Sequence, residues 1–271
     1  MKTRRLNFKF YATLLDAFTG YLKSDAIYER YWGFSENPPH TPEEFREKQF
    51  QSLIDTINRV PFDSEAADRG TAFNEVVDCM VENRKPDKVQ VERVFMVERI
   101  GACDEAGKPM FYEQYDTNEV IALRATYNNR QFDFPISICR EFADYYKGAL
   151  TQQFVQAVLP TCFGDVLLYG YIDELMPMSV HDIKTTGSYY VGKFKDHWQH
   201  VVYPYCLMQN GSDVRLFEYN VTDFKQTYTE SYTFVPERDI PILTSHCEEL
   251  IRFLNDNRAL ITNKKIFAED E

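Results

Sequence analysis

The chain has 271 residues, of which 44% are hydrophobic, 27% charged and 15% aromatic. This composition is that of a globular protein with a sizeable buried core, and it excludes collagen-like, mucin-like and wholly disordered chains. The 30 basic and 42 acidic side chains give a net charge of −12, so any binding of nucleic acid would require a local basic groove.

Cysteine usage and hydropathy narrow the class of protein further. The six cysteines contain no CxxC pair, which argues against a zinc ribbon or an iron–sulfur cluster. No apolar run approaches the ~20 residues that cross a bilayer. The basic start of the chain is interrupted by Asp16 and lacks the cleavage site of a signal peptide. These features predict a cytoplasmic protein that binds no membrane.

Helices are predicted in the first third of the chain, between residues 10 and 60 and again from Glu65 to Glu82. Thr41-Pro42-Glu43-Glu44 combines a hydroxyl cap, a proline in the first turn and a glutamate three residues after the cap, which is typical of a helix start. Val60-Pro61 would end that helix near Arg59.

The pattern then changes to the alternation of β-strands over residues 88–134, with a hairpin turn predicted at Asn128-Asn129, and we interpret this segment as a β insertion. The remaining predicted elements are a helix at 136–148, strands at 153–159, 165–173 and 179–185, a helix at 193–208, strands near 213–221 and 227–235, and a helix at 237–262. Because no linker or repeat interrupts them, we expect a single domain over residues 1–271 with its core at about 65–235. The fold class is α/β (α+β), with a mixed central β-sheet flanked by helices.

The segment 169–186 carries the most chemistry. It predicts two antiparallel strands that turn around Pro177-Met178, so that residues whose numbers sum to 355 face each other. Asp173 would then lie opposite Asp182, on the side of the sheet that also carries Lys184. Two facing carboxylates repel each other, and a cation such as Mg²⁺ is the simplest compensation, with Lys184 placed to orient or deprotonate a water molecule. The alternative is a solvated sheet face with a simple Asp182–Lys184 contact.

The helix predicted next places Lys195, Gln199 and Tyr203 on one face. A cation, an amide and a phenol suit a nucleic-acid backbone or a terminal base beside the metal. Further basic side chains make this the place where a basic groove could form: His181, Lys184, Lys193, His197 and His200. The alternative is an ordinary helix surface with incidental polar residues.

These residues resemble the motifs of the PD-(D/E)XK nuclease superfamily, in particular its RecB-type and lambda-exonuclease-like branch. Gly170-Tyr171-Ile172-Asp173 is similar to the G-x-(I/V)-D motif and Asp182-Ile183-Lys184 to the (D/E)-x-K motif. Gln199 and Tyr203 are similar to the QxxxY motif of the following helix, and the three motifs stand in the family's order.

The first motif of that branch, GxxxHxxxE, is altered in this chain. Gly70 is present, but Asn74 stands in the place of the histidine and Asp78 in the place of the acid. An amide oxygen is able to ligate a hard cation, but it is a weaker ligand than imidazole for transition metals. The cysteine cluster of the iron–sulfur members is absent, so no such cluster is expected.

The resemblance implies a restriction-endonuclease-like core and a nuclease that uses Mg²⁺ or Mn²⁺ to hydrolyse DNA. It further implies an exonuclease that acts on duplex ends in recombination or phage-type DNA processing, with a recombination partner protein or a homo-oligomer as candidate assemblies. The implied metal ligands are Asp173, Asp182 and the Ile183 carbonyl, with weaker contributions from Asn74 and Asp78. Lys184 would position the water molecule, and Gln199 and Tyr203 would shape the DNA end.

Other interpretations remain open. A DNA- or partner-binding protein on the same fold, without catalytic turnover, would also account for Asn74 in place of the histidine. A third alternative is an interaction module that uses its aromatic side chains for partner binding, although most aromatic residues belong to protein cores. Gly187 to Phe194 nearly matches a P-loop, but Phe194 stands where a Mg²⁺-binding hydroxyl is required, which disfavours nucleotide binding.

Overall fold

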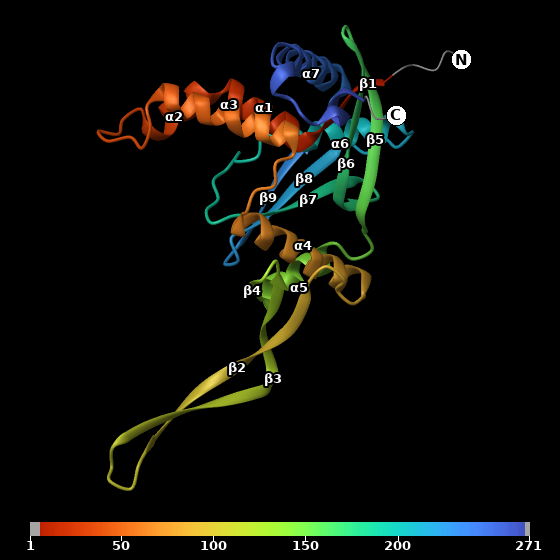
Figure 1. Cartoon of the computed structure of the whole chain (residues 1–271). Coiled ribbons are helices and arrows are strands. Elements are labelled where there is room, and N and C mark those ends of the chain that lie inside the picture. Colours follow the sequence, from red (N-terminus) through yellow and green to blue (C-terminus); the bar gives the residue numbers. More distant parts are fainter. Residues whose placement is uncertain (1–5, 269–271) are drawn as a thin grey trace.

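The computed structural model of the protein describes residues 6–268, without the side chains of residues 98–100 and 111–117 (Figure 1). The chain begins with strand β1 (Leu6–Tyr11) and helices α1 (Ala12–Leu22), α2 (Ser24–Trp32), α3 (Pro42–Asn58) and α4 (Glu65–Glu82). The middle of the chain contains β2 (Gln90–Cys103), β3 (Pro109–Tyr127), β4 (Arg130–Pro135), α5 (Ile136–Tyr145), β5 (Leu150–Thr161), β6 (Gly164–Met176) and β7 (Ser179–Thr185). The last elements are α6 (Gln199–Gln209), β8 (Leu216–Thr222), β9 (Thr227–Thr233), α7 (Pro236–Asp256) and two short 3-10 helices.

Strand β6 organises the mixed central sheet. One edge of β6 pairs antiparallel with β5. Its other edge is shared by two strands, because β1 pairs in parallel with Asp165–Tyr169 and β7 pairs antiparallel with Glu174–Met176. β8 continues the sheet parallel to β7, and β9 closes it antiparallel to β8. The α+β class with a mixed sheet and flanking helices, predicted from the sequence, is confirmed.

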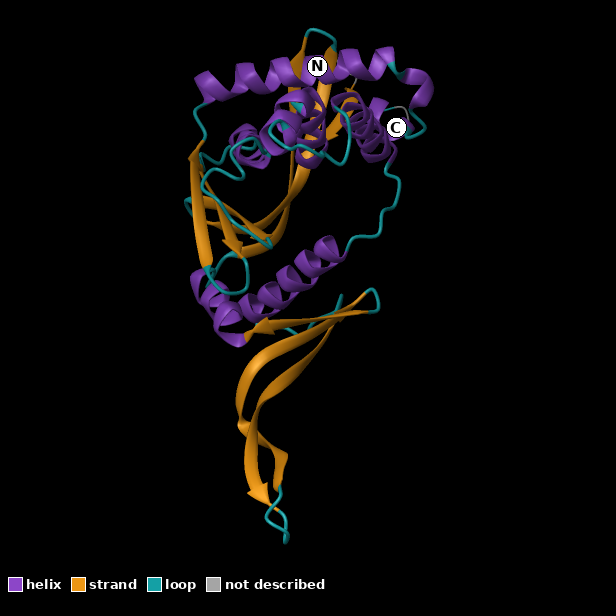
Figure 2. Ribbon diagram, turned by 90° about the vertical axis from the view of Figure 1, so that its left-hand side faces the viewer, coloured by secondary structure: helices purple, strands orange, loops and turns teal. Residues whose placement is uncertain are grey.

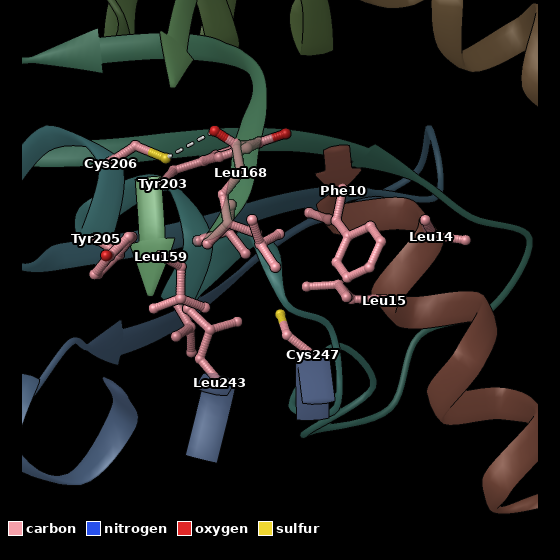
Figure 3. Packing of buried hydrophobic residues seen from close by; sticks show 14 of the residues in the cluster. Phe10, Leu14, Leu15, Leu159, Leu168, Tyr203, Tyr205, Cys206, Leu243 and Cys247 are labelled. Atoms are coloured by element: carbon pink, nitrogen blue, oxygen red, sulfur yellow. Dashed lines mark hydrogen bonds between the residues drawn. The ribbon is translucent and has the colours of Figure 1, made fainter. Parts of the chain in front are cut away.

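Two hydrophobic cores lie on either side of β7. The larger core fills the space between the central sheet and helices α1, α3, α6 and α7, and Figure 3 shows Leu168 and Cys247 within it. The smaller core joins α4 and α5 to the three-stranded sheet β2–β3–β4. Val180 of β7 belongs to the larger core and Ile183 to the smaller one, so β7 is buried on both of its faces.

A long hairpin of β2 and β3 projects away from the rest of the molecule (Figures 1 and 2). Its two strands pair from Gln90↔Thr126 to Cys103↔Pro109. The turn predicted at Asn128-Asn129 joins β3 to β4, and both asparagines have left-handed backbones with φ of 47° and 62°. This is the conformation that a type I′ hairpin turn requires, and asparagine tolerates it better than most residues.

Several element boundaries differ from the sequence-based prediction. Residues 6–11 form a strand, where the prediction has helices from residue 10 onward. Helix α6 begins at Gln199 rather than at residue 193, because residues 191–196 form turns in which Gly192 has φ 79°. Helix α7 ends at Asp256, short of residue 262, and a 3-10 helix follows it.

A buried ion pair joins the middle of α4 to the loop after it. Glu75 is only 2% exposed, and Arg84 Nη1 donates a hydrogen bond to its Oε1 at 2.7 Å. Burial by itself would raise the pKa of Glu75, but hydrogen bonds from Arg84, Cys79 and the Asp87 backbone lower it to about 2.

We expect acid to weaken the fold through Glu75. Because its pKa is lower in the folded chain than the usual 4.5, the carboxylate stabilises the fold above that pH, and the contribution is lost as the pH falls toward 2. Arg84→Met leaves the carboxylate buried without its main donor. This should lower the free energy of unfolding at pH 7 by about 2 kcal/mol. The loss is smaller than for a fully buried ion pair, because Arg84 is itself partly exposed. Urea unfolding between pH 7 and pH 3 measures the difference, and exposed Arg140→Met is the control; equal stability of the two variants would refute the assignment.

Candidate active site

Strands β6 and β7 pair in the register predicted from the sequence. The paired residues are Met176↔Ser179, Leu175↔Val180 and Glu174↔His181, and each pair of numbers sums to 355. The ladder ends before the next pair, which is Asp173 and Asp182. The two aspartates therefore lie where the strands separate.

The β6 edge is open at this point. Between the stretches that pair with β1 and β7, residues 170–173 pair with no strand on that edge in the described part of the chain. The Asp173 side chain makes one of the hydrogen bonds that a paired strand would make there, because its Oδ2 accepts the backbone N–H of Ile183 at 2.9 Å. A side-chain carboxylate thus replaces a strand carbonyl, and β7 stays attached to β6 beyond the end of their ladder.

Asp182 is 2% exposed and binds two neighbouring side chains. Lys184 Nζ lies 2.7 Å from its Oδ2, and Gln199 Nε2 donates to its Oδ1. Burial would lower the pKa of Lys184, but the charge and hydrogen bond of Asp182, together with the charge of Asp173, raise it above its ordinary value. Lys184 therefore carries a positive charge at neutral pH. This suits it to orienting a water molecule or a phosphate oxygen rather than to removing a proton.

Asp173 is held by both α4 and β7. Asn74 Nδ2 of α4 donates to Asp173 Oδ2 at 3.3 Å. Helix α4 packs closely on β7 one turn before Asn74, where a Cβ added at Gly70 would lie 3.4 Å from Thr185 Oγ1. Burial, then the charge of Asp182, raises the pKa of Asp173 to about 7. The structure thus brings Asn74 together with the two aspartates of the sequence motifs.

Asp78 lies deeper than Asn74 and faces a carboxyl group that sequence reasoning missed. Asp78 is 1% exposed, and Glu174 of β6 is fully buried. Burial and the charges of Asp78 and Asp173 raise the pKa of Glu174 to about 9, while burial and the charge of Glu75 raise the pKa of Asp78 to about 6. At neutral pH the two carboxyl groups share about one proton. The sequence contained one signal for Glu174, since it is a second acidic residue directly after Asp173 in a largely apolar strand.

Gln199 and Tyr203 support the site from the interior. They are 8% and 6% exposed, and the Gln199 amide also donates to Tyr203 Oη at 3.4 Å. The Tyr203 ring covers Gly170, where an added Cβ would lie 2.6 Å from Cε1. These side chains position Asp182 and offer little surface to DNA. Lys195 is exposed in the turns before α6, so the predicted stripe of all three residues on one helix is wrong: the helix begins only at Gln199.

The other basic residues predicted to form a groove here are engaged elsewhere. His181 Nδ1 lies 3.0 Å from Asn220 Oδ1 on the opposite face of β7, and burial lowers its pKa. Lys193 Nζ donates to the Ser188 carbonyl at 2.7 Å. Burial lowers the pKa of His200 to about 4, which keeps it neutral. His181 and His200 therefore add little positive charge at the site, whereas Lys193 is bound to the loop that follows β7. His197 Nδ1 lies 3.2 Å from Asp16 Oδ2 of α1.

The oxygen atoms at the site suit a hard cation. The Asp173 and Asp182 carboxylates, the Ile183 carbonyl and the Asn74 amide oxygen are ligands of the type that Mg²⁺ prefers. Asn74 Oδ1 is buried, and within the described residues it has no hydrogen-bond partner. Across that same part of the chain, no three His, Cys, Asp or Glu side chains are grouped to hold a metal. Two carboxylates are sufficient for Mg²⁺, which keeps several of its waters, and its charge would relieve the repulsion between the aspartates.

Comparisons with known proteins add little. No family model matches the chain, and no curated protein is detectably similar to it. A solved structure titled "Crystal structure of SSO0001" is similar with a TM-score of 0.34 and 13% identity, over 45% of this chain and 58% of that one. The chain thus spans little more than half of that structure, and a likeness this weak carries no argument about fold or function. Within residues 6–268, no helix is long and apolar enough to cross a membrane.

Gly170→Ala should disturb the site through Tyr203. The added methyl group would lie 2.6 Å from Tyr203 Cε1, so the ring must move, and Gln199 with it. We expect the free energy of unfolding to fall by about 1–3 kcal/mol, as in other overpacked interiors. Thermal and urea unfolding measure this, with Gly187→Ala as the matched control, because no atom lies within 4 Å of a Cβ at that position. Equal effects of the two substitutions would show that the close approach is unimportant.

Glu174→Gln should stabilise the protein at alkaline pH. The pKa of Glu174 is about 9 in the folded chain against 4.5 ordinarily, so its contribution to stability is fully present below pH 4.5 and is lost as the pH rises through 9. Glutamine is neutral throughout, and we expect a gain of about 2 kcal/mol at pH 8. Urea unfolding in EDTA between pH 5 and pH 9 tests this, with exposed Glu105→Gln as control. A variant less stable than the parent at pH 8 would contradict the expectation.

Proposed function

We propose that this protein is a metal-dependent deoxyribonuclease that hydrolyses phosphodiester bonds and acts as an exonuclease on duplex ends. The observation that carries the proposal is the meeting of Asp173, Asp182 and Lys184 where β6 and β7 separate. Perturbed and poorly solvated charges of this kind cluster at functional sites more often than in structural interiors. The motif resemblance supplies the choice of DNA as substrate and of recombination or phage-type processing as the setting.

The order of elements around the site agrees with this proposal. Helix α4 precedes strands β5, β6 and β7, and helix α6 and strand β8 follow them. This order of one helix, three strands, one helix and one strand is consistent with the restriction-endonuclease-like core that the motif resemblance implies. Each of the four motifs lies on a different element, since Asn74 is on α4, Asp173 on β6, Asp182 on β7 and Gln199 on α6.

Asp173, Asp182, the Ile183 carbonyl and Asn74 Oδ1 are the groups that would hold the cation. When bound, Mg²⁺ or Mn²⁺ supplies positive charge to the phosphate oxygens and lowers the pKa of a water molecule. The Lys184 ammonium group orients that water and stabilises negative charge on the phosphate. Asp182 fixes Lys184 at 2.7 Å, and Gln199 fixes the second oxygen of Asp182, so the position of the lysine depends on α6.

Cleavage of linear and circular duplex DNA in Mg²⁺ or Mn²⁺ tests the proposal. We expect the wild-type protein to degrade the linear form, and Asp182→Ala and Lys184→Ala to lose activity roughly 100-fold or more. Exposed Asp256→Ala and Lys147→Ala remove the same charges elsewhere and should leave the activity unchanged. Circular dichroism of each variant shows whether it is folded. Absence of metal-dependent degradation by folded wild-type protein would refute the nuclease proposal and favour a binding protein on the same fold.

The substitution Asn74→His distinguishes two hypotheses, that the site is a weakened catalytic site and that it has no catalytic turnover. Because Asn74 contacts Asp173 at 3.3 Å, an imidazole placed there would lie beside the same carboxylate. If the site is a nuclease weakened by the loss of a better ligand, cleavage in Mn²⁺ should rise, since imidazole binds transition metals more strongly than an amide does. The same substitution in the Asp182→Ala background should give no cleavage.

A further inference from the structure

A pocket lies on the central sheet, and neither Asp173 nor Asp182 is part of its lining. It has a volume of about 300 Å³ and is formed where β1, β5 and β6 meet the end of α3 and the segment after α7. Three cationic side chains line it, Lys9, Arg59 and Lys265, and the described lining contains no aspartate or glutamate. In a chain whose acidic residues outnumber its basic ones by 42 to 30, such a pocket concentrates positive charge locally.

Arg59 is held in a specific position in this pocket. Its Nη2 donates to Tyr169 Oη at 2.5 Å, and its guanidinium carbon lies 5.4 Å from the centre of the Tyr11 ring. The residue ends α3 in the left-handed conformation, with φ 54°, which favours glycine or asparagine over arginine. Among the described residues, Arg59 contacts a phenol and a ring and forms no ion pair with a carboxylate, so its charge is available to an anion.

An aromatic surface continues from the pocket along the same face of the sheet. Tyr169 of β6 lines the pocket, and Tyr171 follows it on the same face of the strand. Tyr171 and Phe154 of β5 are 58% and 50% exposed, and their ring centres are 5.1 Å apart. Exposed rings beside cations are the combination that binds single-stranded nucleic acid, in which bases stack on the rings and phosphates meet the charges.

Strand β6 connects this surface to the candidate active site. Asp173 follows Tyr169 by four residues, which corresponds to about 13 Å along a strand. A polynucleotide chain that has a phosphate in the pocket therefore needs only a few nucleotides to reach Asp173. Bases in between would pass over Tyr171.

We propose that the pocket formed by Lys9, Arg59 and Lys265 binds a backbone phosphate of the polynucleotide strand whose other part lies in the active site. The inference rests on the proposed nuclease function and names the path of its substrate. Arg59 and Lys265 supply the charge, Tyr171 and Phe154 supply stacking, and no sequence-specific contact is involved. The strand is single at this surface, because the stacking rings require unpaired bases.

The test is the binding of a fluorescent single-stranded oligonucleotide to the full chain in EDTA, measured by anisotropy over a series of salt concentrations. EDTA prevents metal-dependent cleavage, so binding is measured separately from nuclease activity. We expect Arg59→Gln/Lys265→Gln to weaken binding roughly tenfold and to reduce the slope of log K against log salt by about 0.7, which corresponds to one neutralised phosphate of a single strand. Exposed Arg140→Gln/Lys147→Gln, with the same change in net charge, should bind as the wild type does.

The outcomes distinguish this proposal from the nuclease proposal. Equal binding by the two double variants, or no binding by the wild type, would overturn the phosphate pocket whether or not the protein cleaves DNA. Weaker binding by the pocket variant alone would support it, even if no metal-dependent cleavage is found. If inorganic phosphate or a mononucleotide binds in a pocket-dependent manner and the oligonucleotide does not, the pocket serves a small anion instead. If the double variant fails to fold, the single variant Lys265→Gln, which changes an exposed side chain, replaces it in the comparison of oligonucleotide binding.

Discussion

The geometry of the site depends on one hydrogen bond, in which the Asp173 side chain accepts the backbone N–H of Ile183 in place of a backbone carbonyl. β6 pairs with β1 before this point and with β7 after it, so residues 170–173 have an open edge. The Asp173 carboxylate binds the Ile183 N–H across the gap, which keeps β7 close without closing the sheet. A buried N–H left without an acceptor would be destabilising, so the carboxylate has a structural role. The charge of Lys184, which lies 2.7 Å from Asp182, offsets part of the repulsion between the two aspartates.

The elements around this gap are held close by small residues. Gly170 admits the Tyr203 ring of α6, and Gly70 admits α4 against β7. At Gly170 a Cβ would lie 2.6 Å from Tyr203 Cε1, so a larger residue would displace the ring of the helix that also carries Gln199. At Gly70 a Cβ would lie 3.4 Å from Thr185 Oγ1, which is close to ordinary contact. Packing thus explains Gly170 more strongly than Gly70. Neither has a left-handed backbone, and their role is to permit close approach rather than an unusual turn.

The part of the site that could be predicted from the sequence is the part that depends on local register. Pro177-Met178 fixes the turn, and alternation then places Asp173, Asp182 and Lys184 without knowledge of the rest of the fold. The start of α6 could not be predicted in this way. Its position depends on a distant residue, since Asp16 of α1 accepts the N–H of Trp198, the residue directly before the helix, at 2.7 Å.

Two further misses have the same physical origin. β1 is too short for its alternation to outweigh the helical pattern that follows, and it is a strand because Phe8 and Phe10 enter the core beside β6. The raised pKa of Glu174 depends on Asp78, which is 96 positions earlier in the chain, and so on the packing of α4 against the sheet. Contacts between distant segments decide both features, and no pattern within one segment contains them.

The distribution of charge over the molecule follows from these placements. Asp173 and Asp182 lie beside Lys184 inside the fold, and the buried pair of Asp78 and Glu174 lies next to Asp173. The cations Lys9, Arg59 and Lys265 lie outside that group, in the pocket beside Leu167 and Tyr169 of β6. Under the proposed function, a strand of nucleic acid would be attracted by the cationic pocket and repelled by the Asp173 and Asp182 carboxylates until a metal ion is bound. The affinity for the strand and the binding of metal would then be coupled, because each lowers the electrostatic cost of the other.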